Sequence, residues 1–282
     1  MILTTFLLVL LSALLHASWN LVTKKFAGNY SIIYLSFLGG TLLTLYPAMV
    51  HWPESNQVFI DNAWWLVVSC LVHGIYGFIL SYTYFYGDIS TLYPVVRGSG
   101  VALAVIISVF WVGEVFNGYL AAGCTAVIGG IALLSYKRNR KETSKMGILL
   151  AVTCGLLIAT YTVIDKVLVD QIHPITVLFI LQASSGLMFL PYVLKSRMPE
   201  LRNTIKHHWK ATAYVCGAAT MSYSIILYVF QNADVSRVAT VRETAVVFGA
   251  IGGYLIFKES FSLLRLIGVI AVAFGIILVK LS

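Results

Sequence analysis

Charged residues are scarce in this sequence, and that scarcity excludes a soluble globular protein. Asp, Glu, Lys and Arg make up 11% of the 282 residues, whereas hydrophobic residues make up 59%. A soluble domain carries about 25% charged residues and could not bury this much apolar surface. The solvent around the chain must therefore be lipid. The net charge of +8 gives no reason to expect a nucleic-acid partner, because the basic residues of membrane proteins gather in cytoplasmic loops.

Clustered cysteines and catalytic motifs are also missing. Cys70, Cys124, Cys154 and Cys216 stand singly in apolar segments, which is typical of small buried hydrophobic residues rather than of a disulfide or a metal site. The sequence has no nucleophile elbow, zinc motif or glycine-rich phosphate loop. We therefore expect no enzyme activity, no cofactor, no metal and no direct use of ATP.

Long apolar runs fill the chain instead. A membrane-spanning helix needs roughly 20 mostly apolar residues, and ten segments meet that requirement. They cover residues 3–23, 30–50, 63–83, 90–110, 116–136, 146–165, 174–194, 211–231, 237–257 and 262–281. The sequence predicts an all-α membrane protein with ten transmembrane helices.

The second half of the sequence repeats the spacing of the first. In both halves an arginine is followed by a glutamate after 17 residues, by a glycine after nine more and by another glycine after seven more. The two series, offset by 145 residues, are Arg97, Glu114, Gly123, Gly130 and Arg242, Glu259, Gly268, Gly275. Such self-similarity in an apolar chain is typical of a transporter built from two structural repeats, with the substrate site between them.

This offset divides the chain into residues 1–141 and residues 145–282, joined by a basic linker. Each part holds five predicted helices, and because five is odd the two parts enter the membrane with opposite orientations, as inverted repeats. Glu114 and Glu259 each precede the next helix, and we expect them to stabilise its N-terminal dipole. The repeated glycines are expected to be close-packing positions on the fifth and tenth helices.

The distribution of basic residues predicts the orientation. Of the 19 lysines and arginines, all except Arg97, Lys166, Arg237, Arg242 and Lys280 fall in or beside the loops after the first, third, fifth, seventh and ninth helices. Basic loops remain in the cytoplasm. Both chain termini are therefore predicted to lie on the non-cytoplasmic side of the cell membrane.

Three charged residues lie well inside predicted spans: Arg97, Arg242 and Glu243. A charge at the bilayer centre costs about 2.5–3.5 kcal/mol on insertion scales, so each is a functional candidate. The two arginines are equivalent in the repeat, and a guanidinium is a planar fork suited to a carboxylate or phosphate. Arg97 has no acid within a turn or two on its own helix, which favours it as an anion contact. Arg242 and Glu243 stay open between substrate binding and structural pairing with other helices.

A polar stripe runs along the first helix. Ser12, His16 and Asn20 follow one another at intervals of four residues and so share a face, with Trp19 beside them. In lipid this stripe faces either a cavity or another helix to which it hydrogen-bonds. Both readings remain open, and we take His16, Trp19 and Asn20 as candidate substrate contacts.

Tyrosines and a second histidine supply further candidates. Tyr76 and Tyr223 lie deep in their segments, and together with Tyr161 they are expected to shape the cavity. Asp165 ends the sixth segment, four residues after Tyr161. A proton-driven transporter needs a group that titrates as access alternates, and the candidates are Glu243, His16 and His73.

Several segments resemble the EamA type of the drug/metabolite transporter superfamily. The resemblance rests on Gly113-Glu114, Lys258-Glu259 and residues 16–20, 93–98 and 242–248, and it extends over essentially the whole chain. It implies a ten-helix fold whose cavity is lined by helices 1, 3, 4, 6, 8 and 9, with helices 5 and 10 at the periphery. Family members move amino acids, other small metabolites or drugs, often outward. Many have cytoplasmic termini, unlike the orientation predicted from the basic loops.

The sequence as a whole predicts a secondary transporter of a small anionic or zwitterionic metabolite that works by alternating access, with a proton as the candidate coupling ion. It would act as a monomer or homodimer in the cell membrane. A flippase for a lipid or lipid-linked substrate, a multidrug exporter and a membrane-embedded enzyme are the alternatives. A flippase would show a polar groove open between helices, and an enzyme would need a clustered nucleophile or metal set.

Overall fold

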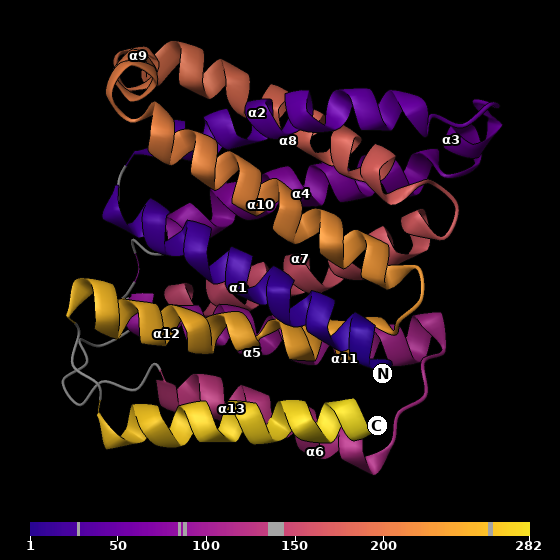
Figure 1. The fold of residues 1–282 in the computed structure, drawn as a ribbon, viewed down its shortest axis with the longest axis vertical. Helices are drawn as coiled ribbons and strands as arrows, with labels where there is room; N and C mark the ends of the chain where they lie inside the picture. Colours follow the sequence, from indigo (N-terminus) through magenta and orange to yellow (C-terminus); the bar gives the residue numbers. More distant parts are fainter. Residues whose placement is uncertain (27–28, 84–85, 87–88, 135–143, 259–261) are drawn as a thin grey trace.

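Helices make up the fold. The computed structural model describes residues 1–282 except 27–28, 84–85, 87–88, 135–143 and 259–261, and its described residues form helices without strands (Figure 1). The helices are α1 (Leu3–Lys25), α2 (Tyr30–Val50), α3 (Gln57–Asp61), α4 (Ala63–Thr83), α5 (Ile89–Ile107), the π-helix η1 (Ser108–Val112), α6 (Gly118–Leu134), α7 (Lys145–Val169), α8 (Pro174–Ser196), α9 (Met198–His207), α10 (Trp209–Phe230), α11 (Val235–Arg242), α12 (Thr244–Phe257) and α13 (Leu263–Leu281).

The all-helical membrane fold expected from the sequence is confirmed. Eight helices in the described part of the chain are long and apolar enough to cross a membrane, counting α11 and α12 as one span. Two shorter apolar helical stretches, Ala63–Gly77 and Gly118–Leu134, fall in the third and fifth predicted segments. Large apolar side chains stay exposed on the surface, among them Phe110 at 86% and Leu42 at 72%. Lipid is the solvent that tolerates such a surface.

Several predicted boundaries were wrong. The sixth predicted segment ended at Asp165, but α7 continues to Val169, so this carboxylate lies a full turn inside its helix. The ninth predicted segment is divided at Glu243 into α11 and α12. A short amphipathic helix, α9, occupies the predicted basic loop after α8. The basic linker between the halves falls largely, and Glu259 entirely, outside the described residues.

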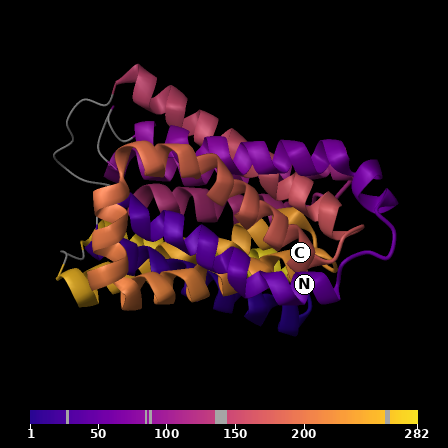
Figure 2. The same cartoon turned by 90° about the horizontal axis from the view of Figure 1, so that it is seen from above.

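The long helices run roughly side by side in alternating directions, and both chain termini lie at one end of the bundle (Figure 1). α1 packs on α10 and α12, α7 packs on α4 and α5, and the view from above shows these helices grouped in more than one layer (Figure 2). α2 and α8 pack together at one edge of the bundle, and α6 and α13 at the opposite edge. The helices that carry most of the candidate site residues are therefore central.

Glycines hold α6 and α13 together at the closest approach of their backbones. A Cβ atom on Gly123 would lie 2.7 Å from the Gly275 carbonyl oxygen, and one on Gly275 would lie 2.6 Å from the Gly123 oxygen. Gly130 and Gly268 meet in the same reciprocal way, at 2.8 Å in each direction. Small residues at such crossings let helices pack closely in lipid, as expected for these four positions.

Gly130→Ala is expected to destabilise the protein by about 1–3 kcal/mol, because the new methyl group would meet the Gly268 carbonyl and the Val272 backbone nitrogen, which cannot rotate away. Gly129→Ala is the matched control, since nothing lies within 4 Å of its Cβ position and alanine is the better helix former. Comparison of the unfolding temperatures of the two purified variants tests this prediction. Equal temperatures would mean that this crossing is not closely packed.

Candidate functional site

Arg97 and Glu243 form a buried ion pair between the two halves of the chain. Arg97 lies on α5, and Glu243 occupies the break between α11 and α12. The Arg97 Nε donates to Glu243 Oε2 at 2.9 Å, and Nη2 donates to Oε1, so the contact is bidentate. The side chains are only 11% and 5% exposed. A buried, two-point pair of this kind fixes α5 against the helix break.

Arg242 has no such partner. It is the last residue of α11, and its buried Nε finds no hydrogen-bond acceptor among the described residues. Its guanidinium carbon lies 5.3 Å from the centre of the Tyr223 ring, a cation–π contact. A buried N–H group without an acceptor is rare in folded proteins and calls for an explanation. Arg242 is therefore the arginine with donor capacity left for a ligand.

The pairing of the two arginines differs from the one expected. The sequence favoured Arg97 as the free anion contact, because no acid is near it on its own helix. Glu243 instead reaches Arg97 from the other half of the chain. The physical reason is that neighbouring residues on a helix point in different directions. Glu243 therefore faces α5, while Arg242 faces Tyr223.

A small cavity lies between these groups. Arg97, Arg242, Glu243 and Tyr161 line it, together with apolar residues of α5, α7, α10 and α11. Its volume of about 20 Å³ suffices for one water molecule and is far below the roughly 300 Å³ or more of a metabolite pocket. In this arrangement of helices the cavity has no room for a metabolite.

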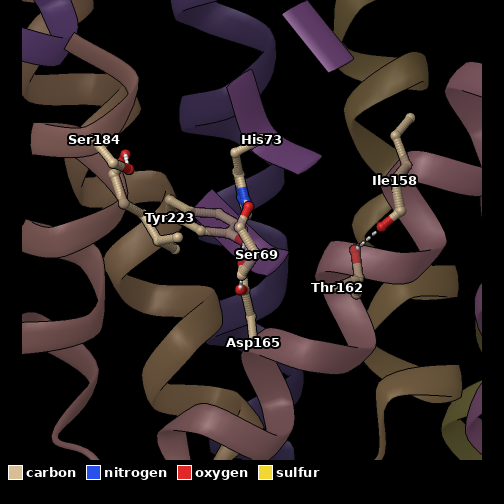
Figure 3. A network of polar contacts seen from close by, with 8 residues as sticks. Ser69, His73, Ile158, Thr162, Asp165, Ser184 and Tyr223 are labelled. Carbon is tan, nitrogen blue, oxygen red and sulfur yellow. Dashed lines mark hydrogen bonds and ion pairs between the residues drawn. The ribbon is translucent and has the colours of Figure 1, made fainter. Parts of the chain in front are cut away.

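A second polar group is centred on Asp165 of α7 (Figure 3). Its carboxylate is fully buried and accepts hydrogen bonds from the Ser69 hydroxyl at 2.5 Å and from the Tyr223 hydroxyl. His73 completes the group, with Nε2 lying 3.6 Å from Asp165 Oδ2. α4, α7 and α10 therefore meet at one carboxylate.

Aromatic rings enclose this polar group. The Tyr161 ring centre lies 4.0 Å from that of His73, and the Tyr76 ring lies 6.0 Å from Tyr161. Tyr223 lies between Asp165, to which its hydroxyl donates, and Arg242, which covers its ring. The structure thus brings together Arg97, Arg242, Glu243, His73, Tyr76, Tyr161 and Tyr223 of the candidate residues.

The polar stripe of α1 is only partly joined to this group. Ser12 bonds α10 directly, donating to the Ser222 carbonyl at 2.8 Å, so it connects two helices. His16 meets Trp19 edge-on at 5.1 Å and lies within electrostatic range of both arginines. Asn20 is exposed and donates to the His16 carbonyl of its own helix at 2.7 Å. None of these residues lines the small cavity.

Glu114 has a structural role, but on a different helix from the one expected. Its carboxylate accepts the backbone N–H groups of Val235 at 2.5 Å and Ser236 at 3.0 Å. These are the first two residues of α11, so Glu114 caps the half-helix that carries Arg242 rather than the helix that follows it in sequence.

Asp165 and Ser69 were not among the candidates. Two signals could have found them: Asp165 stands four residues after Tyr161, and Ser69 stands four residues before His73. Each pair shares one helix face.

Elsewhere, a hollow of about 350 Å³ lies at the end of the bundle that holds the termini, lined by residues that include Asp234 and Arg237. No metal-like group of three His, Cys, Asp or Glu residues occurs among the described residues.

Comparisons with known proteins agree with this architecture. The model of the EamA-like transporter family matches residues 145–281. A protein of known crystal structure shares the fold with a TM-score of 0.79 at 16% sequence identity, over 99% of this chain and 96% of that one. No curated protein matches the sequence. The chain is a multi-pass membrane protein whose second half, residues 145–281, belongs to the EamA-like transporter family, within the drug/metabolite transporter superfamily.

Proposed function

We propose that the protein is a secondary transporter of a small anionic or zwitterionic metabolite, such as an amino acid or another carboxylate. One observation carries this proposal: the buried Nε of Arg242 has no acceptor among the described residues, at a helix break beside a central cavity. A permanently charged, planar group in lipid favours a carboxylate or phosphate ligand. Tyr161 and Tyr223 supply aromatic surface and hydroxyl groups for the rest of the molecule.

The architecture we propose has ten spans in two inverted repeats, residues 1–141 and 145–282. The reciprocal contacts of Gly123 with Gly275 and of Gly130 with Gly268 support it, because a two-fold axis between equivalent residues exchanges these two pairs. The helix contacts exchange in the same way, since α1 packs on α10 as α7 packs on α4. Gly113 and Lys258, also equivalent, both have left-handed backbone, at φ 80° and 56°.

Transport would proceed by alternating access around this central site. The cavity is too small for a metabolite, so each side must open by movement of one group of helices against another. The Arg97–Glu243 pair ties α5 to the α11–α12 break across the two halves. We propose that this pair holds the site together while the surrounding helices rock.

A screen of purified protein against small carboxylates, amino acids and phosphate monoesters tests the function. A ligand that binds only the folded state raises the unfolding temperature, and at about 100 times its Kd adds about 2.7 kcal/mol. We expect carboxylates to raise it and neutral analogues of the same shape to have no effect. Stabilisation by lipid-linked compounds alone would favour a flippase, and stabilisation by uncharged drugs would favour a multidrug exporter.

We also propose that the protein lies in the cell membrane with both termini outside the cytoplasm. The described basic residues Arg202, Lys206 and Lys210 belong to α9 and the start of α10, at the end of the bundle opposite the termini. A fluorescent reporter that matures only in the cytoplasm should stay dark when fused after Ser282. The same reporter inserted after Arg202 should light up. A bright C-terminal fusion with a dark insertion would reverse the orientation.

A further inference from the structure

We propose that Asp165, paired with His73, is the proton-binding site of this transporter and that a proton and the anionic substrate bind together. This inference rests on the proposed function, since it takes Arg242 as the anion contact. Of the proton candidates expected from the sequence, Glu243 is held by Arg97, and His16 packs edge-on against Trp19 and forms no ion pair with a described residue. His73 remains, and together with the neighbouring Asp165 carboxylate it forms the proposed site.

The contacts of Asp165 are those of an ionised acid. Ser69 and Tyr223 each have one hydroxyl hydrogen, and both direct it to the carboxylate. The side chain is completely buried, inside a helix long and apolar enough to cross a membrane. An ionised carboxylate there is costly and is retained for a function. Two hydroxyl donors lower that cost but leave the charge in place.

His73 is oriented so that one nitrogen is left to exchange a proton. Its Nδ1 lies 3.0 Å from the Ser69 carbonyl oxygen, which can only accept, so Nδ1 carries a hydrogen. The other nitrogen, Nε2, lies 3.6 Å from Asp165 Oδ2 and 3.5 Å from the Tyr223 hydroxyl. A proton taken from water can occupy either His73 Nε2 or the Asp165 carboxylate, so the two groups form one proton site.

Charge balance around the cavity links this proton to the anion. Arg97 and Glu243 cancel each other, which leaves Arg242 and Asp165 as the other opposite charges of the centre. The titratable or charged groups that act on Asp165 come from several elements: His73 and Cys70 on α4, Tyr161 on α7, Tyr223 on α10 and Arg242 on α11. Of these, arginine alone is permanently charged.

An anion arriving at Arg242 makes the centre negative by one charge unless a proton arrives as well. In a low-dielectric interior that excess is unfavourable, so anion binding favours protonation of the Asp165–His73 pair. By thermodynamic reciprocity the proton raises anion affinity by the same factor, typically about 5–150-fold. Tyr223 connects the two sites, because its ring lies under Arg242 and its hydroxyl bonds Asp165. Proton and anion therefore cross in the same direction.

Infrared spectroscopy of the full-length protein in lipid nanodiscs tests the proton site without any substrate. As the pH falls from about 8 to about 5, the carbonyl-stretch band of a protonated carboxylic acid should grow. Asp165→Asn should remove this band. Asp170 is an exposed acid nearby in the chain that pairs with Lys166, so Asp170→Asn should keep the band. Tyr223→Phe keeps the carboxyl group but removes a hydrogen bond, so it should shift the band. This shift would assign the band to Asp165 even if the Asp165→Asn variant does not fold.

Proton uptake on adding benzoate in weak buffer tests the coupling. Wild-type protein should take up about one proton per benzoate bound. Asp165→Asn should still bind benzoate but take up none, and its affinity should no longer change with pH. Unchanged uptake in Asp165→Asn, or an infrared band that Asp165→Asn keeps and Tyr223→Phe does not shift, overturns the inference. A band that behaves as expected without benzoate binding at any pH would leave the proton site standing and count against the proposed carboxylate substrate.

Discussion

Glu243→Gln is expected to lower the free energy of unfolding by about 3–5 kcal/mol, because it leaves the Arg97 guanidinium charged, buried and without its carboxylate. Chemical unfolding of the purified protein in detergent measures this loss. Asp170→Asn is the matched control. It breaks the Lys166–Asp170 pair, whose aspartate is 42% exposed, and should cost less than about 1 kcal/mol.

Removing both charges tests whether the loss belongs to the pair. The double variant Arg97→Leu and Glu243→Leu should be more stable than the sum of the two single losses implies, because no unpaired charge remains. A loss for Glu243→Gln as small as that for Asp170→Asn would contradict the buried pair.

Arg242→Gln is expected to weaken anion binding about 100-fold, which corresponds to the loss of a charge-assisted, two-point contact. Stability should fall less than for Glu243→Gln, because the Nε of Arg242 has no acceptor to lose and the change removes only its ring contact with Tyr223 and its charge near Asp165. Arg242→Lys keeps the charge but not the planar fork, so its affinity should be intermediate. Calorimetric titration with the strongest carboxylate of the screen measures the three affinities.

The control for this arginine lies in the other hollow of the molecule. Arg237 pairs with Asp234 and lines the space near the termini. Arg237→Gln should leave carboxylate affinity unchanged. If Arg237→Gln abolished binding while Arg242→Gln did not, the anion site would be in the hollow near the termini.

Much of the fold was predictable because lipid imposes a simple pattern on the chain. Each of the ten predicted apolar segments overlaps one or two helices of the described structure, since a spanning segment must satisfy its backbone internally. The repeated spacing in the sequence singles out Arg97 and Arg242, both of which line the central cavity. It also singles out the glycines at which α6 meets α13.

The pairing of charges was not predictable, because it depends on distances between halves of the chain. Glu243 follows Arg242 directly in sequence, yet it pairs with Arg97, 146 residues away. Glu114 likewise caps α11 rather than its own neighbour. Asp165 was placed at a helix end because hydropathy alone ended the segment there, and the three-helix contact that makes it a site is visible only in the fold.

A crystal structure with a brominated aromatic carboxylate would show whether Arg242 binds the anion, because the anomalous signal of bromine marks the position of the ligand by itself. We expect a carboxylate bonded to the Arg242 guanidinium, an intact Arg97–Glu243 pair and a cavity enlarged around Tyr161 and Tyr223. A ligand bound to Arg97 with Glu243 displaced, or one bound beside Arg237 with nothing at Arg242, would contradict it.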